Sequence, residues 1–226
     1  MQELIKNTST QRANFLNSYE SALKYYRNET DITNRNDGKS KLNKDGKDDP
    51  LRHADNRVPS NFYQLLVDQE AGYVATVPPQ IDAGNEKYNE DIAEALGDDF
   101  ALTVNNLVID ASNAGVAWLH YWIDQDNNFR YAIIPPNQIT PIYSTTLDNK
   151  LLGVLRSYKQ LDSDTGKLFA VHEYWNDKEA TFFKQPTSDL DSLEPYNNIT
   201  SYDMSAGYET GVSNVLKHNF GRVPFI

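Results

Sequence analysis

The chain has 226 residues, no cysteine and a formal net charge of −11 at pH 7. The absence of cysteine excludes a disulfide framework and a thiol nucleophile, and the negative charge argues against broad adhesion to nucleic acid. Aromatic residues make up 12% of the chain, more than a disordered protein carries, so part of the chain must be packed.

The first predicted element is a helix over residues 8–27. Its apolar side chains recur at spacings of three and four residues and form one stripe: Phe15, Tyr19, Leu23 and Tyr26. The residues before it lack the apolar core of a signal peptide. No segment of the chain reaches the ~18 apolar residues of a membrane-spanning helix, so no membrane association is predicted.

A polar segment over residues 33–57 follows and is predicted to be a long mobile loop. It contains almost no apolar residue that a core could bury. Its basic residues give it a positive local charge that could contact phosphate: Lys39, Lys41, Lys44, Lys47, Arg52 and Arg57. No aromatic residues alternate with them, so stacking on nucleic-acid bases is not expected. A solvated segment is the simpler interpretation.

A second helix is predicted over residues 59–75, with Pro59 in its first turn and a cap at Ser60 or Asn61. It should end before the Val-Pro-Pro sequence that follows. Its apolar stripe consists of Phe62, Leu65, Leu66 and Tyr73.

A helical pair is predicted over residues 85–114, divided at Gly97 and ended by Gly115. From residue 116 the hydrophobic period changes from about 3.6 to 2, the period of strands. The predicted strands are 116–124, 129–136, 151–160, 167–176 and 179–185. Short polar turns link several of them, which favours an antiparallel meander. Residues 185–216 lose the period and are predicted to be a loop, before an extended element that begins at Val215. Helices followed by strands indicate the α+β class.

Catalytic patterns are scarce. The sequence has neither a phosphate-binding G-x-x-x-x-G-K-[ST] loop nor a G-x-G-x-x-G turn, so nucleotide hydrolysis by the familiar routes is not expected. One group suggests a metal-dependent nuclease: Asp48, Asp49, His53 and Asp55. Such a site needs a rigid frame, and these residues fall in the predicted loop, which favours a solvated segment instead.

A second acidic group, Asp162, Asp164 and Glu173, echoes a calcium loop but has Lys167 at the position that requires glycine. A hairpin turn explains the same residues more simply. His120 and His172 fall inside predicted strands among aromatic residues, which favours packing over metal ligation. No metal site, no cofactor and no enzyme activity are therefore predicted.

Four stretches nevertheless form a recognisable series. The first ends the first helix and holds Tyr25, Tyr26 and Ile32. The second runs from Asn56 to Pro79 and includes Asn61, Val67, Asp68, Tyr73 and Pro78. The third runs from NAGVAWLHYWID through IIPPNQITPIY to LLGVLRSYKQ and includes Arg156. The fourth is HNFGRVPFI, residues 218–226.

In this order the stretches resemble the portal proteins of tailed bacteriophages, of the type found in siphophages of Gram-positive hosts. The family has a similar Tyr-Tyr-x-Gly-x-x-x-Ile, an Asn-x-x-x-x-Asn helix that runs to a Tyr and a Pro, a Gly-x-Ala-Trp, and a His-Asn-x-x-Gly-x-x-Pro-Phe-Ile. Asn28 departs from the family's glycine, and Ala75 and Thr76 replace another.

The resemblance implies that residues 1–115 are the mainly helical part of the portal wing and residues 116–226 its antiparallel β part. The stem, clip and crown would then lie outside this chain. The intact protein would be a dodecameric ring at the vertex of the virion head, assembled in the host cytoplasm, through which double-stranded DNA is packaged and ejected. Its partners would be terminase, head-tail connector or adaptor proteins, the scaffold and the major capsid protein.

The resemblance also implies a structural protein without an active site, powered by a separate motor. The basic residues of the loop would contact DNA or a neighbouring subunit. The family places much of the ring contact in tunnel helices, so these 226 residues alone are expected to be a monomer or a weak oligomer. Phe225 and Ile226 should pack against the meander or pair with a neighbouring molecule in a crystal. Two alternatives stay open: the nuclease, and a surface-binding module suggested by the tyrosine, asparagine and threonine content.

Overall fold

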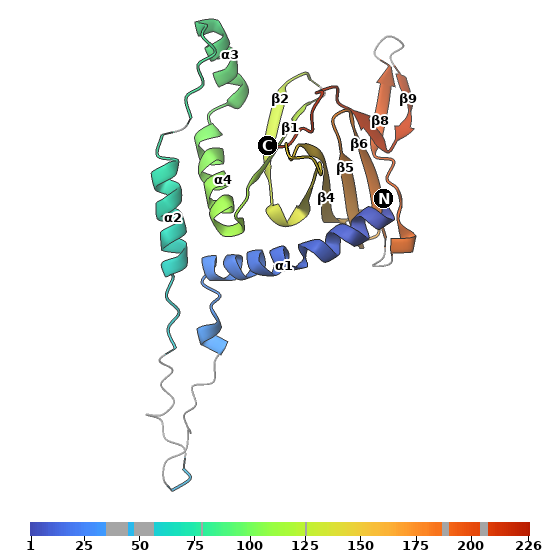
Figure 1. Cartoon of the computed structure of the whole chain (residues 1–226). Helices are drawn as coiled ribbons and strands as arrows, with labels where there is room; N and C mark the ends of the chain where they lie inside the picture. Colours follow the sequence, from blue (N-terminus) through green and yellow to red (C-terminus); the bar gives the residue numbers. More distant parts are fainter. Residues whose placement is uncertain (35–44, 48–56, 78, 125, 187–189, 204–207) are drawn as a thin grey trace.

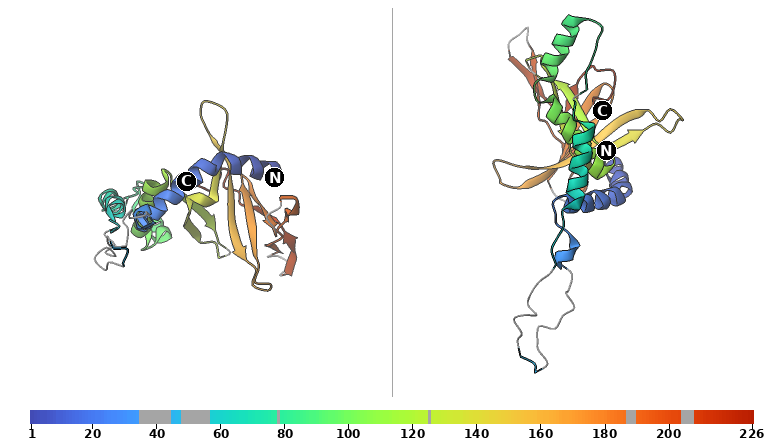
Figure 2. Two further views of the ribbon diagram at one scale, coloured as in Figure 1. Left: turned by 90° about the horizontal axis from the view of Figure 1, so that it is seen from below. Right: turned by 90° about the vertical axis from the view of Figure 1, so that its left-hand side faces the viewer.

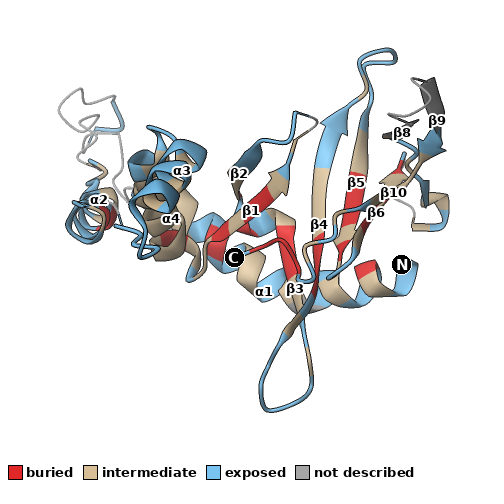
Figure 3. Ribbon diagram, turned by 90° about the horizontal axis from the view of Figure 1, so that it is seen from above, coloured by how far each residue is buried: buried red, intermediate tan, exposed pale blue. Residues whose placement is uncertain are grey.

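The computed structural model describes residues 1–34, 45–47, 57–77, 79–124, 126–186, 190–203 and 208–226. In these residues helices occupy the N-terminal half and antiparallel strands the C-terminal half, which confirms the predicted α+β class. The helices α2–α4 stand at one end of the molecule and the large sheet at the other, with β1 and β2 between them (Figures 1 and 3). No helix in the described part of the chain is both long and apolar enough to cross a membrane.

The helices follow the predicted apolar periods. Their bounds are α1 Gln2–Tyr26, α2 Phe62–Val74, α3 Glu86–Leu96 and α4 Phe100–Ala114, with a short 3-10 helix, η1, at Asp31–Asn34. Gly97 ends α3, and Gly115 ends α4 with φ of 74°, a left-handed conformation that glycine adopts without strain. Both predicted helix ends are therefore confirmed.

The helix α1 begins earlier than the predicted residue 8, because nothing in the preceding sequence breaks it and Ile5 is buried. It runs along one edge of the whole molecule (Figure 1). The side chain of Gln2 bonds the carbonyl of Leu190 at one end, and Arg12 donates to the carbonyl of Pro136 at 3.0 Å in the middle. At its other end α1 packs on α2 and α4, so it ties the helical end to the sheet.

The helix α2 differs from its prediction in two respects. It begins at Phe62, so Pro59 lies before the helix, and Asn61 caps it without a side-chain bond to the backbone. The predicted apolar stripe also faces the other way: Val67 and Ala71 are the residues that are buried against the rest of the molecule. The stripe itself is exposed, which the apolar period alone could not reveal.

Within the described residues the strands form three antiparallel groups. Their bounds are β1 Trp118–Ile123, β2 Phe129–Ile134, β3 Ile139–Tyr143, β4 Leu151–Leu161, β5 Leu168–Trp175, β6 Glu179–Gln185, β7 Glu194–Pro195, β8 Ile199–Asp203, β9 Tyr208–Ser213 and β10 Val215–Lys217. The large sheet has the order β10-β6-β5-β4-β3, with β7 also on β6. Of the predicted meander, β4, β5 and β6 lie side by side in the large sheet, next to β3, which was not predicted. The predicted strands β1 and β2 pair with each other in a separate sheet, and β8 pairs with β9. The hairpins β3–β4 and β4–β5 project from the sheet in opposite directions (Figure 2).

Two regions contain strands that the pattern did not predict. The strand β3 carries Pro141, which breaks the sequence signal, but β3 is an edge strand and an edge tolerates proline. The segment 185–216, predicted to be a loop, holds β7, β8 and β9. These strands are short and lie at the margin of the fold, so little apolar alternation marks them.

The end of the chain packs on β1. The backbone groups of Leu119 and Ile226 exchange two hydrogen bonds of 2.9 Å, and the amide of Tyr121 donates to the carbonyl of Pro224 at 3.2 Å. Phe225 is buried in the main core with Trp118, Ile134, Ile139, Val154, Trp175, Ala180, Phe182 and Val223. The predicted packing of Phe225 against the strands is confirmed, although the side chain of Ile226 stays exposed.

Candidate functional site

The residues proposed from sequence for phosphate contact lie mostly outside the described residues. This applies to Lys39, Lys41, Lys44 and Arg52, and equally to the nuclease group Asp48, Asp49, His53 and Asp55. Lys47 is exposed in a short turn, and Arg57 is half-buried shortly before α2. Their contact with DNA or with a neighbouring subunit stays a prediction.

The acidic turn between β4 and β5 is a hairpin turn. Asp162 accepts hydrogen bonds from the backbone amides of Asp164 at 2.9 Å and Thr165 at 3.3 Å, and these bonds lower its pKa. Glu173 lies on β5 opposite Arg156, away from the turn. The structure therefore does not bring Asp162, Asp164 and Glu173 together. Among the described residues no group of three or more His, Asp or Glu side chains is placed to share a metal ion.

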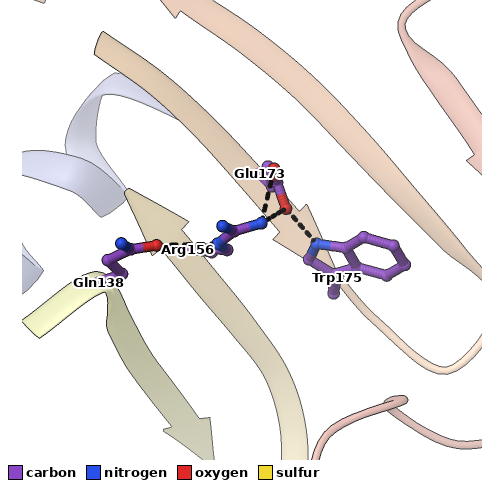
Figure 4. Close-up of polar contacts among 4 residues, drawn as sticks. All are labelled: Gln138, Arg156, Glu173 and Trp175. Carbon is purple, nitrogen blue, oxygen red and sulfur yellow. Dashed lines mark hydrogen bonds and ion pairs between the residues drawn. The ribbon is translucent and has the colours of Figure 1, made fainter. Parts of the chain in front are cut away.

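Glu173 instead belongs to a buried polar network at the centre of the large sheet (Figure 4). Its carboxylate lies 3.3 Å from the Arg156 guanidinium and accepts a 3.0 Å hydrogen bond from the Trp175 indole. Arg156 Nε also donates to Gln138 at 3.1 Å, and the guanidinium lies 4.3 Å over the ring of Tyr158. The network links η3 (Pro136–Gln138), β4 and β5 in one arrangement.

The partner of Arg156 was missed at the sequence level, although a signal for it existed. The turn between β4 and β5 pairs Leu161 with Leu168, and antiparallel pairing from that point sets Arg156 opposite Glu173. Two opposite charges at one register position indicate a cross-strand pair. Glu173 and Trp175 are buried and Arg156 is half-buried, and their hydrogen-bonding groups are directed at one another, which suits a structural role better than chemistry on a substrate.

His120 and His172 lie in strands, as predicted, but only His120 is shown among aromatic rings, whereas His172 contacts polar side chains. His120 is buried with Nδ1 2.8 Å from the carbonyl of Pro224, and its ring lies 4.5 Å from the rings of Trp175 and Phe225. His172 is held between Ser157 at 2.9 Å and Gln185 at 3.1 Å. Burial lowers the pKa of both histidines. The pKa of His218, which is partly buried, is also lowered by burial.

Because the pKa of each of these histidines is lowered, we expect the free energy of unfolding to fall under mildly acidic conditions. A histidine whose pKa is lowered by folding binds its proton more readily in the unfolded state. The contribution of these neutral histidines to stability is therefore fully present above the ordinary histidine pKa of about 6.5. It is lost as the pH falls below that value. We expect a lower urea midpoint at pH 5.5 than at pH 7.5. The variant His120→Gln should show a shallower dependence, and equal midpoints at both pH values for the natural chain would contradict the prediction.

The outward side of α2 exposes several large apolar side chains. We call it the α2 surface and define it by four side chains that are 50–87% exposed: Phe62, Leu65, Leu66 and Tyr73. Spacings of three, four and seven residues place them on one side of the helix, opposite the buried Val67 and Ala71. Large apolar residues thus face outward and small ones inward. A contiguous exposed apolar stripe of this kind marks an interaction surface.

Comparison with known proteins identifies the family. The family described as "Phage portal protein, SPP1 Gp6-like" matches residues 5–226, nearly the whole chain. The chain belongs to this portal family. The portal protein of Clostridium phage phiCD119 is 38% identical over 170 residues, which cover 70% of this chain and 37% of that protein. The portal protein of Bacillus phage SPP1 is 27% identical over 177 residues, which cover 76% of this chain and 33% of that protein.

The match confirms the resemblance to portal proteins and gives no support to the nuclease or surface-binding alternatives. This portal-family chain spans about a third of the length of the two relatives. Its similarity extends across both the helical and the β half, because the matched range includes both.

The sequence motifs of this portal-family chain meet in pairs in the fold. The hydroxyl of Tyr26, at the end of α1, donates to Asp68 of α2 at 2.8 Å. Burial, with the Asp68 bond next, raises the pKa of Tyr26 to about 12. The third and fourth motifs meet in the core, where Trp118 and Phe225 belong to one cluster. The motifs therefore hold the helices together and close the core around β1.

Proposed function

We propose that this chain is the peripheral wing of a portal subunit, with residues 1–115 as its helical part and residues 116–226 as its β part. The observation that carries the proposal is the portal-family match over residues 5–226. The relatives are about three times as long as the aligned region, which leaves room for a stem, a clip and a crown elsewhere in the full protein.

The full subunit then forms a dodecameric ring at the head vertex of the virion. Double-stranded DNA passes through the ring during packaging and ejection, and terminase, the connector or adaptor proteins, the scaffold and the major capsid protein dock on it. Assembly takes place in the bacterial host cytoplasm. The subunit is structural rather than enzymatic, and the motor supplies the energy.

The charge of the chain disfavours tight binding to DNA. A net charge of −11 repels phosphate groups, so the wing as a whole is not expected to adhere to duplex DNA. The basic residues of the segment 33–57 are proposed as a local exception that touches DNA or a neighbouring subunit: Lys39, Lys41, Lys44, Lys47, Arg52 and Arg57.

The experiment that tests the proposal uses the full-length protein. Native mass spectrometry should find a closed ring of identical subunits, and negative-stain electron microscopy should show a central opening. The same preparation should release no phosphate from ATP and should leave duplex DNA intact when magnesium or manganese is added. A protein that stays monomeric at concentrations well above a micromolar, or that cuts DNA in a metal-dependent way, would overturn the proposal.

A further inference from the structure

An apolar hollow lies between the helical half and the end of the chain. Its volume is about 580 Å³, several times the roughly 150 Å³ of a cavity that holds one benzene molecule. Residues of α2, α4 and β1 and the last residue of the chain line it: Val74, Leu107, Val108, Leu119 and Ile226. The hollow thus lies where three elements of the fold meet.

The lining of this hollow suits an apolar occupant. The polar side chains in the lining bond each other, because Ser112 donates a 3.2 Å hydrogen bond to Glu70. The apolar side chains Val74 and Ile226 are 59% and 74% exposed. Covering such surface is favourable, since apolar area is then removed from water. The lining therefore favours a segment that carries an apolar side chain.

The end of the chain reaches this hollow as an extended segment on the edge of β1. The backbone groups of Leu119 and Ile226 exchange two hydrogen bonds of 2.9 Å, and Phe225 stands opposite His120 in an antiparallel bridge. Figure 3 shows the end of the chain beside β1, between α4 and the large sheet. Because the pairing is antiparallel, a residue that follows Ile226 is directed along β1 towards Ala117, which also lines the hollow.

The register of this pairing specifies where the next residues would lie. Hydrogen-bonded pairs alternate with other pairs along an antiparallel ladder, so the next hydrogen-bonded pair joins Ala117 to the second residue after Ile226. Within the described part of the chain no backbone hydrogen bond involves Ala117. Leu119 and Ile226 both line the hollow, whereas Phe225 belongs to the core. Since side chains alternate between the two faces of a strand, the second residue after Ile226 faces the hollow as well.

We infer that the residues directly after Ile226 in the full subunit extend this strand on β1, and that the second of them places an apolar side chain in the hollow. The inference rests on the proposed function, in which the subunit continues past Ile226 beyond the wing. The relatives are about three times as long as the aligned region. The added strand would join α2 and α4 to β1. It would thus fix the helical part of the wing to its β part at the point where the chain leaves the wing.

Cysteine cross-linking in the full-length protein is the main test. These 226 residues contain no cysteine, so Leu107→Cys or Val108→Cys can be combined with a cysteine at the second position after Ile226, with any other cysteine replaced. Oxidation should give a disulfide within one subunit, detected by peptide mass mapping, because only neighbouring Cβ atoms can be bridged. Leu102→Cys is the matched control: Leu102 lies on the same helix and is 61% exposed outside the hollow, so it should give no such link.

Amide exchange tests the backbone pairing independently. The Ala117 amide should exchange about tenfold or more slowly in the full-length protein than in the 226-residue chain, because only the longer chain supplies its partner. Leu107→Glu in the full-length protein should restore fast exchange, since a carboxylate in the hollow would have to lose its water. The Leu119 amide, bonded to Ile226, should stay slow in that variant and so report that the fold is retained. Leu102→Glu is the matched control and should leave the Ala117 amide slow.

The outcomes separate this inference from the proposed function. If the full-length protein forms rings, but neither cysteine pair closes within a subunit and the Ala117 amide exchanges equally fast in both chains, the inference is wrong. A disulfide between two subunits would also overturn it, because a neighbouring subunit would then fill the hollow. If the full-length protein forms no ring, but the link within a subunit and the slow exchange are present, the proposed function fails and the contact on β1 stands.

Discussion

Replacing Glu173 by alanine should lower the free energy of unfolding by about 3 kcal/mol. Removal of one member of a buried ion pair leaves the other charge uncompensated, which typically costs ~3–5 kcal/mol. The lower end applies here because the Arg156 side chain keeps 23% of its surface in water while that of Glu173 keeps 5%. The Trp175 indole would lose its acceptor at the same time. Urea unfolding of the 226-residue chain measures the change.

Two further variants distinguish the charge from the hydrogen bonds. Glu173→Gln keeps a hydrogen-bond acceptor near Trp175 and Arg156. Its free energy of unfolding should therefore fall by less than that of the alanine variant. The double variant Arg156→Met with Glu173→Leu removes both charges and should be less destabilised than Glu173→Ala alone, because no unpaired charge remains. A double variant that is less stable than Glu173→Ala would mean that Arg156 and Glu173 do not act as a pair.

The helical half shows which features local sequence patterns can predict and which they cannot. Apolar spacing predicted the four helices, and glycine predicted where α3 and α4 end, since both are set by residues close in sequence. The orientation of α2 was beyond such a pattern. A stripe shows that a helix has an apolar side, but not whether its own chain or another molecule covers that side, and in this chain the side of Val67 and Ala71 is the one that packs.

The β half shows a second limit on what the sequence could predict. Alternation predicted the five strands whose apolar signal is strong, and short turns predicted the meander of which β4, β5 and β6 are part. The Arg156–Glu173 pair was within reach, because one known turn fixes the register of both strands. The contact of Phe225 with His120 was harder to specify, as these residues are far apart in sequence and no turn between them sets their register.

That long-range contact gives the second large prediction. Phe225→Ala should lower the free energy of unfolding by about 3–5 kcal/mol, the usual cost of emptying a buried phenylalanine site. Phe225 is 5% exposed, and its ring centroid lies 4.5 Å from that of His120 on β1 and 5.9 Å from that of Trp175 on β5. Removal of the ring therefore leaves a cavity between the β1–β2 sheet and the large sheet. Urea unfolding at pH 7.5, where His120 is neutral, gives the value.

Ile226→Ala provides the matched control for that prediction. Ile226 forms the backbone bonds to Leu119 that an alanine would keep, and its side chain is 74% exposed, so the change should stay within about 0.5 kcal/mol. Amide exchange adds a local readout: in Phe225→Ala the amides of Leu119 and Tyr121 should exchange faster, because the segment that pairs with them is no longer anchored. Equal stability of the two variants would mean that the backbone bonds, rather than the aromatic ring, hold the end of the chain on β1.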